Sequence, residues 1–362
     1  MDSERELGSD LTVDQIQNFI AESESNMSNL DSQLRSIQIL RDKERSRIRL
    51  LRYLMAPIHV LPVEVLAEIF LFSVGGTHDA SEVFRVSHVC YCWRQLAHNT
   101  PRLWMHCSIT LRHHPGPSDA YITVLKTWLD LSLRLPLFLS ITTRHYDFDL
   151  TDVLKTIIPV TSRLTTLDLD LTAYWRLVPL FKVPLEALEV LRLKYWYPES
   201  SPIDNWEALD LSCAPQLRSV FLPEDYEDFV FNIPWHQLTH LGLINNPDVC
   251  LEVLPRCLNL EHADIGSFAW DDDIDLPEQP IFILPNLRSL QYKIESLESD
   301  MGQFVPFFKR LSLPALTSLK LCLPEGSTVS SQYISWSAAD FSRFQAQTNS
   351  SVSCEPLQSS VA

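Results

Sequence analysis

The chain has 362 residues, of which 46% are hydrophobic and 21% charged, a composition that can bury the cores of about two to three domains. Its eight glycines form no phosphate-binding loop, and the sequence lacks the nucleophile motif of serine hydrolases and the paired motifs of zinc enzymes, which disfavours an enzyme. A net charge of −17 disfavours a nucleic-acid partner. No apolar run is long enough to span a membrane, and the polar first ten residues do not resemble a secretory signal.

The eight cysteines are scattered along the sequence, which favours free, buried thiols in a reducing compartment. Cys90 and Cys92 lie near His88 and His98, but residues two apart on a helix point to different faces. We therefore expect no metal site and no cofactor, and a location in the cytoplasm or the nucleus.

Residues 1–10 are polar and are predicted to be disordered, whereas residues 11–56 contain neither glycine nor proline and are predicted to form one long helix. Its apolar residues recur at the a and d positions of a heptad repeat, and nine of these twelve positions are apolar. The twelve are Val13, Ile16, Ile20, Ser23, Met27, Leu30, Leu34, Ile37, Arg41, Glu44, Ile48 and Leu51. Such a narrow apolar seam requires another helix to cover it.

Charge is distributed unevenly along this segment. Residues 1–34 carry eight acidic groups and one basic group, and residues 35–52 carry seven basic and two acidic groups. This distribution suits an antiparallel homodimer with its two-fold axis near residue 32, in which Val13 faces Leu51, Ile16 faces Ile48 and Arg41 meets Ser23. Packing of the helix against the rest of this chain is an equally weighted alternative.

Residues 57–105 are predicted to form a small helical module. Pro57 ends the long helix, Leu61-Pro62 opens the next one, and Gly75-Gly76 separates it from a further apolar pattern that reaches Ala97. The module contains more apolar side chains than a unit of this size can bury. An exposed docking face is therefore expected.

The order and spacing of the rare residues in this module are specific. Leu-Pro-x-Glu at 61–64 is followed by Val-Cys-x-x-Trp-Arg at 89–94 and by Pro-x-Leu-Trp at 101–104, and in these motifs the segment resembles an F-box. The resemblance implies three helices that dock onto the small adaptor subunit of cullin–RING ubiquitin ligases. Carried over by motif, the adaptor-binding residues would be Leu61, Pro62, Ile69, Val89, Cys90 and Trp93. The Gly75-Gly76-Thr77-His78 link is less apolar than is usual in that family.

Residues 106–325 are predicted to form an irregular array of leucine-rich repeats. The pattern L-x-x-L-x-L, or a close variant, begins at Leu164, Leu188, Leu217, Leu238, Leu260, Leu287 and Leu316. The spacings of 21 to 29 residues match one short strand per repeat on the inner wall of a horseshoe. The predicted fold class is therefore helical at the N-terminus, followed by an α/β solenoid.

Two segments beside this array carry further predictions. Residues 118–134 are predicted to form a helix and residues 137–141 a strand, and the phrase from Leu125 to Leu137 resembles a segment of the F-box and repeat proteins expanded in mushroom-forming fungi. Residues 326–362 contain eleven serines and no visible repeat, and are predicted to be mostly disordered.

The residues between the buried leucines of each strand project from the inner wall and are candidates for binding a substrate. The candidates are Asp168, Asp170, Arg192, Lys194, Trp196, Phe221, Asp264 and Lys293. Acidic runs at 224–228 and 271–273 favour a basic protein segment as the partner. Asp168 and Asp170 have no nucleophile, histidine or third ligand nearby in the sequence, so they are expected to be non-catalytic.

These predictions favour a non-catalytic substrate-recognition subunit of an SCF-type ubiquitin ligase, in which the F-box docks to the adaptor and the repeats bind a protein substrate. The alternative is a dimeric repeat scaffold unrelated to ubiquitin. The substrate itself is not encoded in any motif of the sequence.

Overall fold

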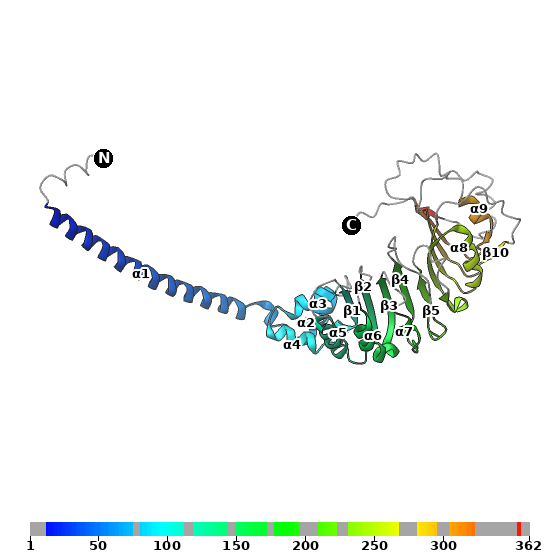
Figure 1. The fold of residues 1–362 in the computed structure, drawn as a ribbon, viewed down its shortest axis with the longest axis horizontal. Coiled ribbons are helices and arrows are strands. Elements are labelled where there is room, and N and C mark those ends of the chain that lie inside the picture. The colour runs from blue at the N-terminus through cyan, green and yellow to red at the C-terminus, as the bar shows by residue number, and fades with distance from the viewer. Residues whose placement is uncertain are drawn as a thin grey trace. The chain divides into compact units, whose positions relative to one another are not determined.

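The structure is a computed structural model of the chain (Figure 1), and it is described for the following residues. They are 12–74, 80–111, 119–143, 149–171, 177–195, 209–222, 231–267, 281–294, 304–322 and 353–355. The chain divides into two compact units, Met1–Glu68 and Ile69–Ala362, and each is described by itself.

The first unit consists mainly of the helix α1 (Val13–Leu54), followed by the short 3-10 helix η1 (Pro57–His59). Thr12 and Gln15 form a capping box at the start of α1, in which the Thr12 N–H donates to Gln15 Oε1 at 3.0 Å. Pro57 marks the other end, because proline lacks the N–H that a continuing helix needs. The predicted helix over 11–56 is confirmed with slightly shorter bounds.

The helix α2 (Val63–Val74) crosses the division between the units, and short helices follow it along the chain. These are α3 (Ala80–Ser87), α4 (Tyr91–His98), η2 (Pro101–Trp104), α5 (Asp119–Leu131), α6 (Thr151–Ile157), η3 (Ile158–Arg163), α7 (Val178–Phe181), η6 (Trp235–Gln237), α8 (Pro247–Val253), η7 (Leu254–Arg256) and α9 (Phe304–Lys309). The three helices predicted for the module are α2, α3 and α4.

Ten strands of the second unit form one parallel sheet, and their order in the sheet follows their order along the chain. They are β1 (His106–Leu111), β2 (Leu137–Thr143), β3 (Leu164–Leu171), β4 (Val190–Tyr195), β6 (Ser219–Phe221), β8 (His240–Asn245), β9 (His262–Ser267), β11 (Ser289–Ile294), β13 (Ser318–Cys322) and β14 (Ser353–Glu355). Two short parallel pairs accompany the sheet: β5 (Leu209–Asp210) with β7 (Phe231–Asn232), and β10 (Phe282–Ile283) with β12 (Leu311–Ser312). In Figure 1 the sheet is curved, and α5, α6 and α7 follow its outer side.

The apolar positions of the repeated sequence pattern form the core of this unit. All of them are buried except Leu321, which is half-buried. One backbone hydrogen bond also recurs from strand to strand: Glu189 N–H donates to Thr165 O, Arg218 to Glu189, Thr239 to Arg218, Glu261 to Thr239, Arg288 to Glu261 and Thr317 to Arg288, at 2.8 to 2.9 Å. The units that the sequence pattern defines are thus structurally equivalent.

Two strands of the ten-stranded sheet were not predicted from the sequence. Strand β1 precedes the first repeat and pairs in parallel with β2, from His106 opposite Phe138 to Leu111 opposite Thr143. Strand β14 lies within the serine-rich tail, which was predicted to be mostly disordered, and pairs with β13. The rest of the tail and residues 1–10 lie outside the described residues.

Candidate functional site

The first candidate site is the helical module, whose core is built around aromatic side chains. Phe70 on α2 is buried, and its ring centroid lies 4.8 Å from that of Trp93 on α4. Phe84 on α3 is 6.0 Å from the Trp104 ring, and Trp104 is almost fully buried. These contacts hold together the helices and the turn that carry Ile69, Val89, Cys90 and Trp93, the candidate docking residues of the second unit.

Residues at the start of α2 are exposed although they are apolar. Leu61 is 37% exposed, Pro62 is exposed, and the Leu66 N–H donates to the Pro62 carbonyl at 3.1 Å, so the proline closes the first turn of α2. Val63 and Val65, which follow them, are 62% and 45% exposed. The start of α2 therefore leaves an apolar strip in contact with solvent.

In the second unit, the four other candidates occupy two different environments. Ile69 and Val89 are 45% and 61% exposed and are free to meet a partner. Cys90 is half-buried and caps α4, because its Sγ accepts the Trp93 N–H at 3.5 Å. Trp93 is also half-buried against Phe70, so Cys90 and Trp93 help to hold the module together and offer only part of their surface.

Two exposed aromatic side chains of the module were not among the candidates. Phe72 on α2 is 90% exposed, and Tyr91, the first residue of α4, is 71% exposed. The signal was present in the sequence, because Phe72 is off the helical face that Leu66 and Phe70 define. The Gly75–His78 link lies outside the described residues.

The second candidate site is the face of the sheet opposite the buried leucines, here called the open face. The strand registers place Asp168, Arg192, Phe221, Gly242 and Asp264 opposite one another on consecutive strands β3, β4, β6, β8 and β9. Neighbouring strands lie about 4.8 Å apart, so these positions form one continuous row. Four of the eight predicted substrate-binding residues are brought together in this way.

Contacts within the row give it a defined chemistry. The guanidinium carbon of Arg192 lies 5.1 Å from the centroid of the Phe221 ring, a cation–π arrangement. The Phe221 ring lies over Gly242, where any side chain would overlap it. Lys194 Nζ is 3.9 Å from Asp168 Oδ2, and because Lys194 is largely exposed this ion pair adds little stability. Three strands thus present a basic and aromatic centre.

The remaining predicted residues occupy a neighbouring row or lie elsewhere. Asp170 on β3 is opposite Lys194 on β4. Lys293 on β11 is opposite Gly266 on β9 at the same level of the sheet, four strands beyond β4. Trp196 and the acidic runs at 224–228 and 271–273 lie outside the described residues. Gly242 was missed from the sequence, although its lack of a side chain makes room for the Phe221 ring. A glycine in a strand can equally mark a bulge or a bend, so its role could not be inferred from the residue type alone.

A pair of histidines lies at the start of the same face. His240 and His262 are opposite each other on β8 and β9, with ring centroids 4.5 Å apart and planes 19° apart. His240 Nδ1 is 2.9 Å from Thr239 Oγ1. Burial, together with the neighbouring His262, lowers the pKa of His240 from its ordinary value, which favours the neutral His240 ring.

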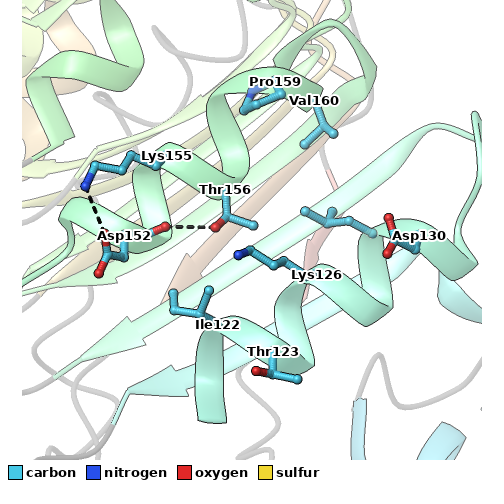
Figure 2. A pocket seen from close by; sticks show the side chains of 10 residues that line it. Ile122, Thr123, Lys126, Asp130, Asp152, Lys155, Thr156, Pro159 and Val160 are labelled. Atoms are coloured by element: carbon cyan, nitrogen blue, oxygen red, sulfur yellow. Dashed lines mark hydrogen bonds and ion pairs between the residues drawn. The ribbon is translucent and has the colours of Figure 1, made fainter. Parts of the chain in front are cut away.

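A groove of about 730 Å³ lies on the outer side of the sheet, between α5 and α6 (Figure 2). Lys126 and Asp130 line it from α5, and Asp152 and Lys155 from α6, where Lys155 Nζ is 3.0 Å from Asp152 Oδ1. The residues that line the groove include no cysteine, histidine or tyrosine. The polar side chains that line it are carboxylates, lysine amines and threonine hydroxyls.

Seven cysteines have described side chains, of which Cys107, Cys250, Cys257 and Cys322 are buried and Cys92 is exposed. All seven are free thiols, and burial raises the pKa of Cys107, Cys250 and Cys257 to about 12, so these thiols stay protonated and unreactive. Within the described ranges, no three His, Cys, Asp or Glu side chains are grouped as a metal site would require. None of the described helices combines the length and apolar character of a membrane span.

Comparison with known families identifies the helical module. Residues 58–110 match the family F-box-like, and this match includes all six candidate adaptor-binding residues and all of β1 except Leu111. The chain therefore contains an F-box-like domain. The match covers 53 of the 362 residues and ends within β1, the first strand of the sheet, before α5. No curated protein matches the chain.

Proposed function

We propose that the chain is a substrate-recognition subunit of an SCF-type ubiquitin ligase. The F-box-like domain would dock onto the small adaptor subunit, and the parallel sheet would act as an irregular leucine-rich-repeat solenoid whose open face binds a protein substrate. The chain itself would carry out no bond chemistry, and its place of action would be the cytoplasm or the nucleus.

The observation that carries this proposal is the exposed apolar surface of the F-box-like domain. Val63, Ile69, Phe72 and Val89 are each at least 45% exposed, within a domain whose sequence matches a family of adaptor-binding modules. Exposed apolar side chains gathered in one small domain mark a surface for a partner protein. The exposed Tyr91 is a further candidate contact, because tyrosine is a common binding hot spot.

The repeat interpretation of the sheet is supported by its regularity. Equivalent leucines are buried in successive units, the recurring hydrogen bond joins each unit to the next, and the strands are parallel in chain order. An array of this kind offers an extended face for a folded or unfolded polypeptide. Holding a substrate there would raise its effective concentration beside the ubiquitin-loaded enzyme.

The substrate site would centre on Arg192, Phe221 and Asp264. An aromatic ring flanked by a cation on one side and a carboxylate beyond Gly242 can contact a segment that carries both apolar and charged residues. The net charge of the chain favours a basic segment over an acidic one.

Retention of the purified adaptor subunit by the full-length chain tests the ligase assignment. We expect the wild type to bind and the double variant Leu61→Ala/Pro62→Ala to lose at least about tenfold in affinity, because two contacts of the docking surface are removed. The double variant Val124→Ala/Leu258→Ala is the matched control, since it truncates exposed apolar residues outside the F-box-like domain. Failure of the wild type to bind would overturn the assignment.

Capture of substrates after proteasome inhibition tests the open face. Proteins that accumulate on the wild type and on the Leu61→Ala/Pro62→Ala variant, but not on Phe221→Ala, would be candidates for a substrate bound at this face. If Phe221→Ala retains the same proteins as the wild type, the proposed substrate site is wrong. If no adaptor is bound at all, the scaffold alternative becomes the better account, and the exposed helix α1 would then be its principal interaction surface.

A further inference from the structure

The helix α1 exposes an apolar seam that has no role in the function proposed above. It has 42 residues, a length of about 63 Å, and none of its side chains is buried. The central seam residues Met27, Leu30, Leu34 and Ile37 are 56% to 64% exposed. A helix of this length with an uncovered apolar seam is incomplete as a folded element.

The composition of α1 shows that intrinsic propensity alone does not stabilise it. Residues 13–54 include six serines and three asparagines, which are poorer helix formers than alanine or leucine. Its described ion pairs are exposed, such as Arg45 with Asp42 at 3.8 Å and Arg47 with Glu44 at 4.0 Å, and pairs of this kind contribute little. Burial of the seam is the remaining source of stability.

We infer that α1 is covered by α1 of a second copy of this chain, in an antiparallel two-stranded coiled coil. Nine of the twelve a and d positions are apolar, which is the pattern of a two-helix coiled coil, and the exposed Phe19, Leu40 and Leu54 at g positions widen the seam along one edge. This inference does not depend on the ligase proposal, because it uses only residues 13–54.

Charge complementarity argues for a second copy. Residues 13–34 carry four acidic groups and no basic group, a charge of −4, and residues 35–54 carry seven basic and two acidic groups, a charge of +5. In an antiparallel pair the acidic half of each helix lies beside the basic half of the other. Two copies of one helix thus supply both signs of charge to each other.

The same charges argue against a parallel pair. In-register parallel helices would place Arg41 against Arg41 and Glu44 against Glu44 inside the seam, and Arg47 at a g position beside Arg52 at an e position. Like charges in such positions cost stability, and the antiparallel arrangement separates all three pairs.

An antiparallel register about residue 32 gives six distinct layers, each of which occurs twice in the symmetric pair. In every layer an a residue meets a d residue. The layers are Val13 with Leu51, Ile16 with Ile48, Ile20 with Glu44, Ser23 with Arg41, Met27 with Ile37, and Leu30 with Leu34. Four layers are wholly apolar. The two polar layers contain long side chains whose charged ends reach solvent, and they disfavour shifted registers.

Sedimentation of the full-length chain at about 10 µM tests the dimer. We expect twice the chain mass of 41.6 kDa. The variant Leu30→Asp/Leu34→Asp places four carboxylates at the centre of the pair and is expected to raise the dissociation constant at least about 100-fold. The matched variant Ser25→Asp/Ser32→Asp adds the same charge at outward f positions and is expected to remain dimeric. A monomeric wild type, or a monomeric control variant, would overturn the inference.

Disulfide trapping tests the direction of the helices. Chains with Met27→Cys are mixed with chains with Ile37→Cys and oxidised, and the linked tryptic peptides are identified by mass. The antiparallel register predicts a bond between position 27 of one copy and position 37 of the other. Bonds joining position 27 to position 27, or position 37 to position 37, would show a parallel pair and contradict the inference.

Discussion

At the scale of single residues, the open face depends on one glycine. Gly242 lies beneath the Phe221 ring, and a methyl group built there would overlap ring carbon Cδ1 and lie 3.0 Å from Cε1. The ring in turn faces the Arg192 guanidinium. A residue with no side chain therefore positions an aromatic group and a cation at the proposed substrate site.

Gly242→Ala is expected to displace the Phe221 ring and to lower the free energy of unfolding by about 1 kcal/mol, near the lower end for overpacking because the ring is only half-buried. In a Phe221→Ala background the same change should cost less than about 0.5 kcal/mol, since nothing remains to overlap. Urea unfolding of the four chains measures this coupling. An equal cost in both backgrounds would contradict the packing described.

The stacked histidines predict a pH dependence of stability. The folded-state pKa of His240 is lowered by burial and by His262, so the unfolded chain takes up a proton before the folded chain does. The contribution of His240 to stability is therefore complete above the unfolded pKa of about 6.5 and is lost as the pH falls below it.

His240→Gln should flatten this part of the pH dependence, which is measured as the difference in unfolding free energy between about pH 7.5 and pH 5 in the wild type and the variant. A variant whose stability falls with pH as steeply as that of the wild type would show that the stacked pair does not control the effect.

At the scale of elements, an aromatic cluster joins the F-box-like domain to the first layer of the sheet. The rings of Trp104 in η2 and Trp128 in α5 have centroids 4.8 Å apart at 74°, and Trp128 Nε1 donates to the Trp104 carbonyl oxygen at 2.7 Å. Phe84 of α3 lies 5.4 Å from the Trp128 ring. Through Trp104, the Pro-x-Leu-Trp motif thus packs the module onto the segment that follows it.

Trp128→Phe removes this buried hydrogen bond and part of the ring volume. We expect it to lower the free energy of unfolding by about 2 kcal/mol, because the Trp104 carbonyl loses its partner and a small cavity forms. Trp235→Phe, at a half-buried site in η6, is the control and should cost less than about 1 kcal/mol. Comparable unfolding midpoints in urea for the two variants would contradict this role of the cluster.

Elements with strong periodicity were predictable from the sequence, and isolated ones were not. The long helix was predicted to within two residues at each end, and each L-x-x-L-x-L segment lies at a strand of the sheet, because its leucines alternate with polar residues. Strand β1 was missed because His106–Leu111 contains no copy of that pattern. Strand β14 was missed because three residues in a serine-rich tail carry no period at all.

The candidate sites were predictable only in part, because spacing in sequence does not give burial. Leu61, Ile69 and Val89 are exposed as a docking surface requires, whereas Cys90 caps a helix and Trp93 packs on Phe70. The exposed and the half-buried residues belong to the same sequence motifs, and only the packing in the structure distinguishes them.

At the scale of the whole molecule, the length of α1 sets a distance. In the antiparallel register about residue 32, Leu54 of one copy lies level with position 10 of the other, so the two Leu54 residues are 44 residues apart along the pair, or about 66 Å. A two-headed assembly would thus present its F-box-like domains from opposite ends of a rod. Excising one heptad would bring these attachment points about 10 Å closer while keeping the phase of the seam, which makes the spacing adjustable by design.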